Sequence, residues 1–239
     1  MRYLILSDIH SNLVALDAVV ADAAGTYDEI INCGDLVGYG PKPNEIVAWC
    51  RLHTPQVVRG NHDKACVGLE DLEWFNPDAR ASAVWTNQQL TEENRTYLQE
   101  LPKGPRDIGD FQIVHGSPVD EDEYLLNMAE VKFASSYVTT PLTFFGHTHV
   151  QGGFLIHRNG IRRMGGPVIE LENDVLYLIN PGSVGQPRDG DPRAAYASYD
   201  TEARTVVFGR VAYDVQATQL DILRAGLPEM LAYRLEVGR

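Results

Sequence analysis

The chain has 239 residues, of which 44% are hydrophobic and 22% charged, a composition typical of a globular protein. Its 21 glycines and 13 prolines are scattered, which excludes a collagen-like or broadly disordered chain. No apolar run approaches the roughly 20 residues that span a bilayer, and the short apolar N-terminus is expected to be a strand rather than a signal peptide. Cys33, Cys50 and Cys66 show no disulfide or C-x-x-C spacing, so we expect reduced thiols and a cytoplasmic protein.

The formal net charge is −13 with histidine neutral. Nucleic acids and anionic membranes are bound through clustered lysine and arginine, so neither is expected as a partner. The absence of any Lys/Arg run also argues against a nuclease. A small anionic substrate is compatible with the charge, because surface charges are screened beyond about 8 Å and a cationic pocket acts locally.

The first part of the chain alternates strand-like and helix-like patterns. The expected strands are Tyr3–Leu6, Glu29–Asn32 and Gln56–Arg59, with helices through Leu13–Val20 and Glu45–Leu52 between them. Strands that alternate with helices predict βαβ units and an at least partly parallel sheet.

The segment from about Asp71 to Leu101 breaks this alternation. Asn76 and Pro77 are typical of an N-cap and a first helical position, and a second helix is expected to start at Thr91. We therefore predict a helical insertion over about 71–101. No linker divides the chain, which predicts one domain over residues 1–239.

The second half is rich in predicted strands, and a C-terminal helical stretch follows them. Single strands are expected at Phe111–Val114 and Leu142–Phe145. Hairpins are expected for Phe154–Ile156 with Ile161–Met164, for Val168–Leu171 with Val175–Ile179, and for Ala195–Tyr199 with Thr205–Val211. The helical stretch runs from Val215 to about Glu236, with a break at Gly226-Leu227-Pro228.

Five short strings carry the chemistry, and four of them end or follow a predicted strand. They are Asp8-Ile9-His10, Gly34-Asp35, Gly60-Asn61-His62-Asp63, His115-Gly116 and Gly146-His147-Thr148-His149. Ligands of open α/β sheets bind at the carboxyl ends of strands, so these strings can assemble one site. Imidazole, carboxylate and amide ligands favour Mn²⁺, Fe, Co²⁺, Ni²⁺ or Zn²⁺ over Cu(I) or an iron–sulfur cluster.

The strings differ in how much they indicate. Asp-x-His and Gly-Asp occur by accident in many proteins, and for His115 taken alone a core histidine is the favoured interpretation. Gly-His-x-His and Gly-Asn-His are rarer, and both together are expected roughly once in two thousand chains of this composition. The combination therefore favours a metal site over chance.

The ordered set D-x-H, G-D, G-N-H-D, H and G-H-x-H resembles the calcineurin-like metallophosphoesterases. The run from Asn180 to Arg188, Asn-Pro-Gly-Ser-Val-Gly-Gln-Pro-Arg, is similar to their small bacterial and archaeal phosphodiesterase branch. The resemblance extends from Ser7 to about Arg193. It implies an α/β fold, a four-layer α/β/β/α sandwich of two mixed sheets flanked by helices, with a two-metal centre at the strand ends.

The resemblance also implies roles for individual residues and two divalent transition-metal ions, with manganese favoured and Fe, Zn, Ni or Co as alternatives. Asp8, His10 and His149 would hold the first ion, Asn61, His115 and His147 the second, and Asp35 both. His62 would contact the phosphate and assist the leaving oxygen, and Asn12 would touch a metal-bound water. The implied reaction is in-line attack of a metal-bridging hydroxide on a small-molecule phosphodiester or phosphomonoester.

One departure from the family bears on the substrate. The protein-phosphatase branch reads G-D-x-x-D-R-G, whereas this chain has Gly38 and Tyr39 in place of that Asp and Arg. Loss of a bidentate guanidinium favours a singly charged phosphodiester over a dianionic monoester. Asp63 is the candidate to orient His62, with loop hydrogen bonding as an equal alternative. Arg188 is a candidate substrate ligand or part of a structural turn.

Other functions stay open from the sequence. A non-catalytic scaffold that binds a protein partner is disfavoured, because unpaired buried ligands would be costly to keep. A protein phosphatase or a dinucleoside-polyphosphate hydrolase would use the same centre. Trp74, Phe75 and Asn76 at the start of the insertion either roof the cleft and select the leaving group or, the favoured role, pack in the core.

Overall fold

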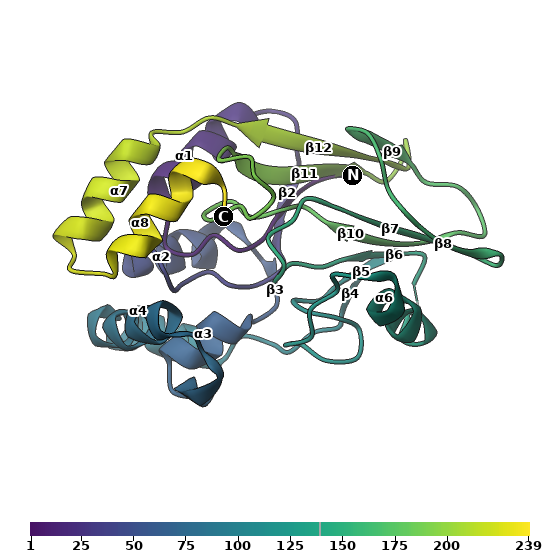
Figure 1. Ribbon diagram of the computed structural model, residues 1–239. Helices are drawn as coiled ribbons and strands as arrows, with labels where there is room; N and C mark the ends of the chain where they lie inside the picture. The colour runs from purple at the N-terminus through teal and green to yellow at the C-terminus, as the bar shows by residue number, and fades with distance from the viewer. Residues whose placement is uncertain (139) are drawn as a thin grey trace.

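The computed structural model describes residues 1–138 and 140–239, and over these residues two six-stranded sheets stack face to face (Figure 1). The first sheet has the order β3 (Gln56–Val57), β2 (Glu29–Asn32), β1 (Arg2–Leu6), β11 (Ala194–Asp200), β12 (Thr205–Val211) and β9 (Val168–Glu170). The second has the order β4 (Arg106–Ile108), β5 (Phe111–Ile113), β6 (Leu142–Phe144), β10 (Leu176–Asn180), β7 (Gly152–His157) and β8 (Gly160–Arg163). Both sheets mix parallel and antiparallel pairs.

Helices flank the two sheets, some of them packed on other helices rather than on a strand. They are α1 (Leu13–Asp22), α2 (Pro43–His53), α3 (Asn61–Cys66), α4 (Pro77–Gln89), α5 (Glu92–Gln99), α6 (Met128–Ala134), α7 (Val215–Arg224) and α8 (Glu229–Tyr233). Leu4 and Leu6 of β1 pack with α1 and α2, and Leu178 of β10 packs with Val131 and Ala134 of α6. The four-layer α/β/β/α sandwich is confirmed.

The space between the two sheets is filled by an apolar cluster drawn from both. Ile5 and Ile31 of the first sheet meet Phe111, Phe144 and Tyr177 of the second. Successive residues of a strand point to opposite faces, so β1 presents Leu4 and Leu6 to the helices and Ile5 to the other sheet. This pattern explains why β1 reads as a continuous apolar run.

The parallel strands bring distant segments of the chain to one place. β1, β2 and β3 run parallel in the first sheet, and β5, β6 and β10 run parallel in the second. The loops that follow these strands therefore all begin at carboxyl ends of strands, which is where open α/β sheets bind ligands.

The helical insertion is found where the sequence predicted it. Asn76 caps α4 by accepting a hydrogen bond from the Ala79 N–H at 3.0 Å, and Thr91 caps α5 in the same way from Asn94. A 3₁₀ turn, Leu72–Trp74, precedes α4. The C-terminal break at Gly226–Pro228 is also confirmed, since it separates α7 from α8. The helices α3 and α6 were not predicted.

One predicted hairpin is wrong. The strands at 168–170 and 176–180 do not pair with each other: β9 pairs with β12 in the first sheet, and β10 pairs with β6 and β7 in the second. The turn around Glu172–Asp174 carries the chain from one sheet to the other. A short polar turn between two apolar runs looks the same in both cases, so the sequence pattern does not distinguish them. The other two hairpins, β7 with β8 and β11 with β12, are confirmed.

Within the described residues, no helix combines the length and apolar character needed to cross a bilayer.

The inter-sheet cluster predicts a large effect for one truncation. Ile5 is fully buried in it, so Ile5→Ala should lower the free energy of unfolding by about 2–5 kcal/mol through lost apolar burial and a cavity. Leu52 is 80% exposed, and Leu52→Ala should change stability by less than about 0.5 kcal/mol. Urea unfolding of both variants in chelator measures the difference, and equal effects would contradict this description of the core.

Candidate metal centre

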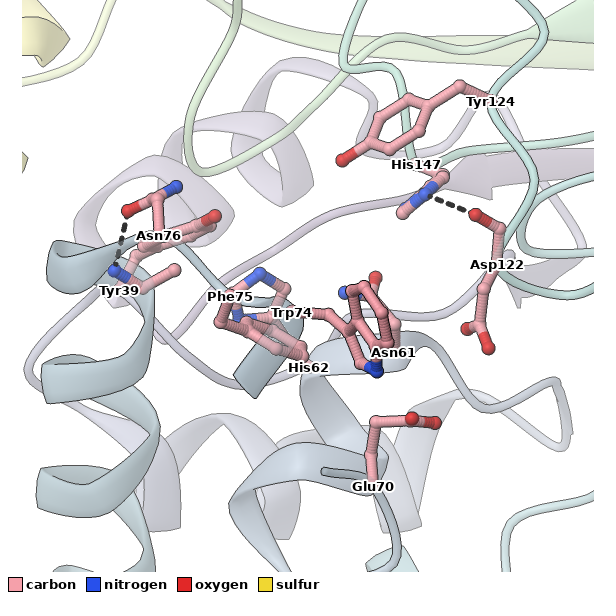
Figure 2. A pocket seen from close by; sticks show the side chains of 11 residues that line it. Tyr39, Asn61, His62, Glu70, Trp74, Phe75, Asn76, Asp122, Tyr124 and His147 are labelled. Atoms are coloured by element: carbon pink, nitrogen blue, oxygen red, sulfur yellow. Dashed lines mark hydrogen bonds between the residues drawn. The ribbon is translucent and has the colours of Figure 1, made fainter. Parts of the chain in front are cut away.

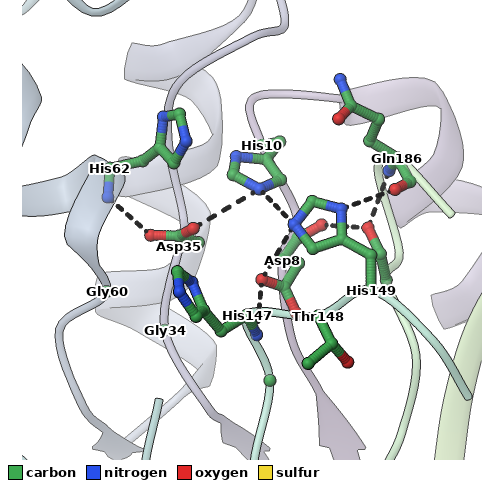
Figure 3. A network of polar contacts seen from close by, with 12 residues as sticks. Asp8, His10, Gly34, Asp35, Gly60, His62, His147, Thr148, His149 and Gln186 are labelled. Atoms are coloured by element: carbon green, nitrogen blue, oxygen red, sulfur yellow. Dashed lines mark hydrogen bonds and ion pairs between the residues drawn. The ribbon is translucent and has the colours of Figure 1, made fainter. Parts of the chain in front are cut away.

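The loops at the strand ends bring six buried acidic and imidazole groups into two overlapping sets, and Figure 3 labels all of them except His115. The first set contains Asp8, His10, Asp35 and His149, and the second contains Asp35, His115 and His147. Within each set one ligand atom of every residue lies within 4.8 Å of the others. Asp35 belongs to both sets, so its carboxylate is the common element of the site.

The closest approaches are between imidazole nitrogens and carboxylate oxygens. Nε2 of His10 and Nε2 of His115 lie 3.5 and 3.4 Å from Oδ2 of Asp35. Nε2 of His149 lies 3.3 Å from Oδ1 of Asp8. Oδ1 of Asn61 lies 3.3 Å from Nε2 of His115, which adds an amide oxygen to the second set.

Backbone carbonyls fix the orientation of each imidazole. His10, His115 and His149 donate from Nδ1 to the carbonyls of Val37, Cys33 and Gln186, and His147 donates from Nε2 to the carbonyl of Asp122. A carbonyl only accepts, so the nitrogen that faces it carries the proton. The opposite nitrogen of each ring then faces the centre of the site, which is how metal-binding histidines are held in proteins.

Two observations show that these groups fit metal ions. Oδ2 of Asp8 and Oδ2 of Asp35 are buried without a hydrogen-bond partner among the described residues. Nε2 of His10 and Nε2 of His149 lie only 3.1 Å apart, and both rings already carry their proton on the other nitrogen. Buried oxygens and facing lone pairs are unfavourable alone, and a bound cation would stabilise both.

The pKa values follow from burial and from the two carboxylates. Burial holds the pKa of His10 well below its usual value and lowers that of His147 to about 3. Burial acts to raise the pKa of Asp35, but His115, His62 and His10 together outweigh it and hold the pKa well below the usual range. For His115 burial is likewise outweighed, and the Asp35 carboxylate raises its pKa to about 10.

The backbone of the site adopts conformations that side chains normally avoid. Seven of the non-glycine residues with positive φ belong to the strand-end loops: Asp8, His10, Ser11, Asp35, Tyr39, His147 and His149. Such residues cost about 1–3 kcal/mol each and cluster at functional sites. The strain is concentrated on the residues that carry the candidate ligands.

Two glycines permit close packing between these loops. A Cβ on Gly60 would lie 2.0 Å from Oδ1 of Asp35, and one on Gly146 would lie 2.0 Å from Oγ of Ser7. The first approach allows the His62 N–H to donate to Oδ1 of Asp35 at 2.9 Å. The glycines of the two rarer motifs are thus needed for the assembly of the site.

His62 lies beside both sets and is 4% exposed. Its ring contacts those of His10, Tyr39 and Phe75, with centroids 4.9, 4.3 and 5.1 Å away. Burial lowers its pKa to about 4. Nδ1 has no hydrogen-bond partner among the described residues, and a Cβ on Gly38 would lie 2.7 Å from that atom. Gly38 therefore leaves one edge of His62 without a side-chain partner.

Asp63 and Asn12 are engaged with the backbone. Asp63 accepts hydrogen bonds from the N–H groups of Leu36, Val37 and Gly60, and burial raises its pKa to about 7. These bonds match the loop role that the sequence left open, and none of them reaches His62. Asn12 caps α1 and donates to the carbonyl of Gly185, so its polar atoms are also used within the fold.

Arg188 approaches the site from the loop between β10 and β11. Its guanidinium lies over the ring of Tyr39 at 5.6 Å and donates to the Tyr39 hydroxyl at 3.3 Å and to Oε1 of Gln186 at 2.9 Å. Its backbone N–H donates to the carbonyl of His149. Its charge contributes to the lowered pKa of both His62 and His149, after burial.

A cavity of about 310 Å³ opens beside these residues (Figure 2). Asn61, His62 and His147 form its inner wall. The lining also includes Trp74, Phe75 and Asn76, which the sequence analysis named as a candidate roof of the cleft. Glu70, Asp122 and Tyr124 line the same cavity and were not identified from the sequence. The only signal for Asp122 and Tyr124 was their place in the loop after His115, because no motif contains them.

Comparisons with known proteins agree with this geometry. Residues 1–204 match the Calcineurin-like phosphoesterase superfamily domain. The chain is 36% identical to the uncharacterized protein MJ0912 of Methanocaldococcus jannaschii, over 98% of this chain and 97% of that protein.

Two solved structures extend the comparison. The crystal structure of a metallophosphoesterase from Sphaerobacter thermophilus is 44% identical with a TM-score of 0.88, covering 100% of this chain and 99% of that one. The hypothetical protein PH1004 from Pyrococcus horikoshii OT3 shares the fold with a TM-score of 0.80 at 21% identity, over 100% and 98% of the two chains. The family resemblance inferred from the motifs is confirmed: the chain belongs to the calcineurin-like phosphoesterase superfamily and is a metal-dependent phosphate ester hydrolase.

Proposed function

We propose that this protein is a two-metal phosphodiesterase that hydrolyses small phosphate diesters. The observation that carries the proposal is the position of Asp35, whose buried carboxylate belongs to both sets of ligands beside an open cavity. A carboxylate shared in this way suits two cations held side by side.

The ligand sets suggest how two ions would be held. Asp8, His10 and His149 would hold the first, Asn61, His115 and His147 the second, and Asp35 both. Bound divalent ions would polarise the phosphoryl oxygens and lower the pKa of water at the site. The mixed nitrogen and oxygen ligands favour manganese, with Fe, Zn, Ni or Co as alternatives.

His62 would assist departure of the leaving oxygen. It is neutral at pH 7 in the free protein because burial lowers its pKa to about 4. A bound phosphate anion raises the pKa of an adjacent imidazole by charge interaction, so substrate itself would favour the protonated ring. No side chain needs to orient Nδ1 for this role, because Tyr39 and Phe75 hold the ring from its sides.

Arg188 would contact the phosphate of the substrate. Tyr39 stands where the protein-phosphatase branch has arginine, and the guanidinium of Arg188 lies over the ring of Tyr39. The guanidinium of Arg188 thereby lies beside position 39, although it comes from another loop. Its hydrogen bonds to Gln186 and Tyr39 already use part of its donors, which favours one negative charge over two on the substrate.

We also propose a cytoplasmic location. Cys33, Cys50 and Cys66 are all free and buried, as is usual for thiols in a reducing compartment.

Metal binding tests the shared carboxylate directly. Asp35→Asn should lower the bound metal per chain and weaken the remaining affinity by at least about tenfold, because one ligand serves both sets. Calorimetric titration with Mn²⁺ and elemental analysis measure both quantities. Asp17→Asn on the exposed face of α1 is the matched control and should bind like the original protein. An Asp35→Asn protein that retains two tightly bound ions would contradict the proposal.

Substitution of His62 tests its role in leaving-group departure. His62→Gln should lower kcat by about 10²–10⁴-fold for a diester with an alkyl leaving group, which needs a proton. The loss should be much smaller for bis(4-nitrophenyl) phosphate, whose nitrophenolate leaves without one. His53→Gln, on the exposed end of α2, should leave both rates unchanged. Equal losses on the two substrates at unchanged metal content would assign His62 to another role.

Substitution of Arg188 tests its contact with the phosphate. Arg188→Gln should lower kcat/KM by about 10- to 100-fold through loss of charge-assisted hydrogen bonds. Arg193 is exposed and paired with Asp191, so Arg193→Gln is the matched control and should have no effect. Steady-state kinetics of the two variants on one diester measure the difference, and an unaltered Arg188→Gln enzyme would restrict Arg188 to a structural role.

A further inference from the structure

We infer that the cavity beside His62 is a subsite for the leaving group and that it takes a nucleoside: a flat ring carrying a sugar, without additional phosphates. This inference rests on the proposed function, because it assumes that His62 faces the departing oxygen. The lining of the cavity then determines which alcohol that oxygen belongs to.

The position of the cavity follows from the chain itself. Its inner wall is formed by Asn61, His62 and His147, and its outer wall by Trp74 and Phe75 at the start of the helical insertion (Figure 2). A group bonded to an oxygen beside His62 must extend away from the candidate ligands. Apart from Tyr39, the rest of the lining comes from Glu70, from the insertion that follows it, and from the loop that carries Asp122 and Tyr124.

Trp74 provides a surface for a flat ring. It lines the cavity yet is 88% exposed, and within the described residues no aromatic ring stacks on it. Phe75 differs, because it packs against buried residues and against His62. An indole left open to water beside a reactive site gains from being covered by another flat ring. The core role favoured for this segment thus holds for Phe75 and not for Trp74.

Two carboxylates define the polar part of the subsite. Glu70 and Asp122 line the cavity, and both carboxylates pair with Lys64 at 2.9 and 2.7 Å. The Lys64 side chain is only 5% exposed, so its charge lies behind the carboxylates rather than in the cavity. Carboxylates accept hydrogen bonds and do not donate, so they suit the hydroxyl groups of a sugar or the amino group of a base.

The same carboxylates act against further phosphate groups. A second phosphate on the leaving group would meet Glu70 and Asp122 before it met Lys64. Like charges at such distances disfavour binding. A volume of about 310 Å³ lies at the lower limit of ligand pockets, which suits one base and sugar rather than a peptide. The subsite therefore favours nucleoside diesters over dinucleoside polyphosphates and phosphoproteins.

Binding of free nucleosides tests the subsite without any hydrolysis. Adenosine, guanosine, cytidine and uridine are titrated by ligand-observed NMR into the protein with and without Mn²⁺, and ribose serves as the baseless probe. At least one nucleoside should bind, and Trp74→Ala should weaken it by about 5- to 100-fold, the range of a lost stacking contact. Trp74→Phe should restore most of the affinity. Tyr233→Ala, which removes a half-exposed ring on α8 outside the cavity lining, should have no effect.

Hydrolysis provides the second measurement. The substrates are adenosine 5′-(methyl phosphate) and ribose 5-(methyl phosphate), which share the reacting bond and differ by the base. The enzyme should prefer the adenosine diester by at least about fivefold in kcat/KM, mainly through KM, and Trp74→Ala should remove that preference while leaving the ribose diester unchanged. Glu70→Gln should improve hydrolysis of a diester whose leaving nucleoside carries an additional phosphate.

The outcomes separate this inference from the proposed function. If no nucleoside binds, or if Trp74→Ala binds them all as the original protein does, the inference is overturned, although hydrolysis of bis(4-nitrophenyl) phosphate would still support a phosphodiesterase. If a nucleoside binds through Trp74 and no diester is hydrolysed with any divalent metal, the subsite stands and the proposed function falls.

Discussion

The carboxylate of Asp35 is the group on which the rest of the site depends. It is fully buried, and Oδ1 accepts the N–H of His62. Oδ2 faces the imidazoles of His10 and His115 and has no hydrogen-bond partner among the residues that the structure describes. A buried carboxylate in this state costs several kcal/mol unless positive charge compensates it. The loops of both sheets bring the imidazoles of His10 and His115 next to this carboxylate, so the residues around it are those that would share a cation with it.

The sandwich provides the rigidity that this arrangement requires. Left-handed backbone at Asp8, His10, Asp35, His147 and His149 costs about 1–3 kcal/mol per residue, and it persists only where the surroundings dictate it. Each of these residues follows a strand of the buried cores, and backbone carbonyls then fix the imidazoles. The burial of apolar side chains between the two sheets thus supports a set of strained loops that would not hold their shape alone.

The candidate ligands at the strand ends could be predicted from the sequence, but most of the residues that line the cavity could not. Asp8 and His10, or His147 and His149, lie two residues apart after apolar runs, so local pattern and motif together place them correctly. The crossing of the chain between sheets at Glu172–Asp174 was missed, because a turn between two strands has the same pattern whichever sheets they join. Lining residues such as Glu70 and Asp122 belong to no motif, and their roles depend on tertiary contacts with Lys64.

Two differences from the protein-phosphatase pattern are coupled in space. Gly38 removes a carboxylate from the edge of His62, and Tyr39 removes a guanidinium, but the Tyr39 ring then supports both His62 and the incoming Arg188. An imidazole without a carboxylate partner has a lower pKa, and a bound phosphate anion would raise it again. Arginine placed on an aromatic ring keeps its charge near the phosphate while the ring fixes its position. The Tyr39 side chain thus holds His62 and Arg188 in a chain that lacks the Asp and Arg of the protein-phosphatase pattern.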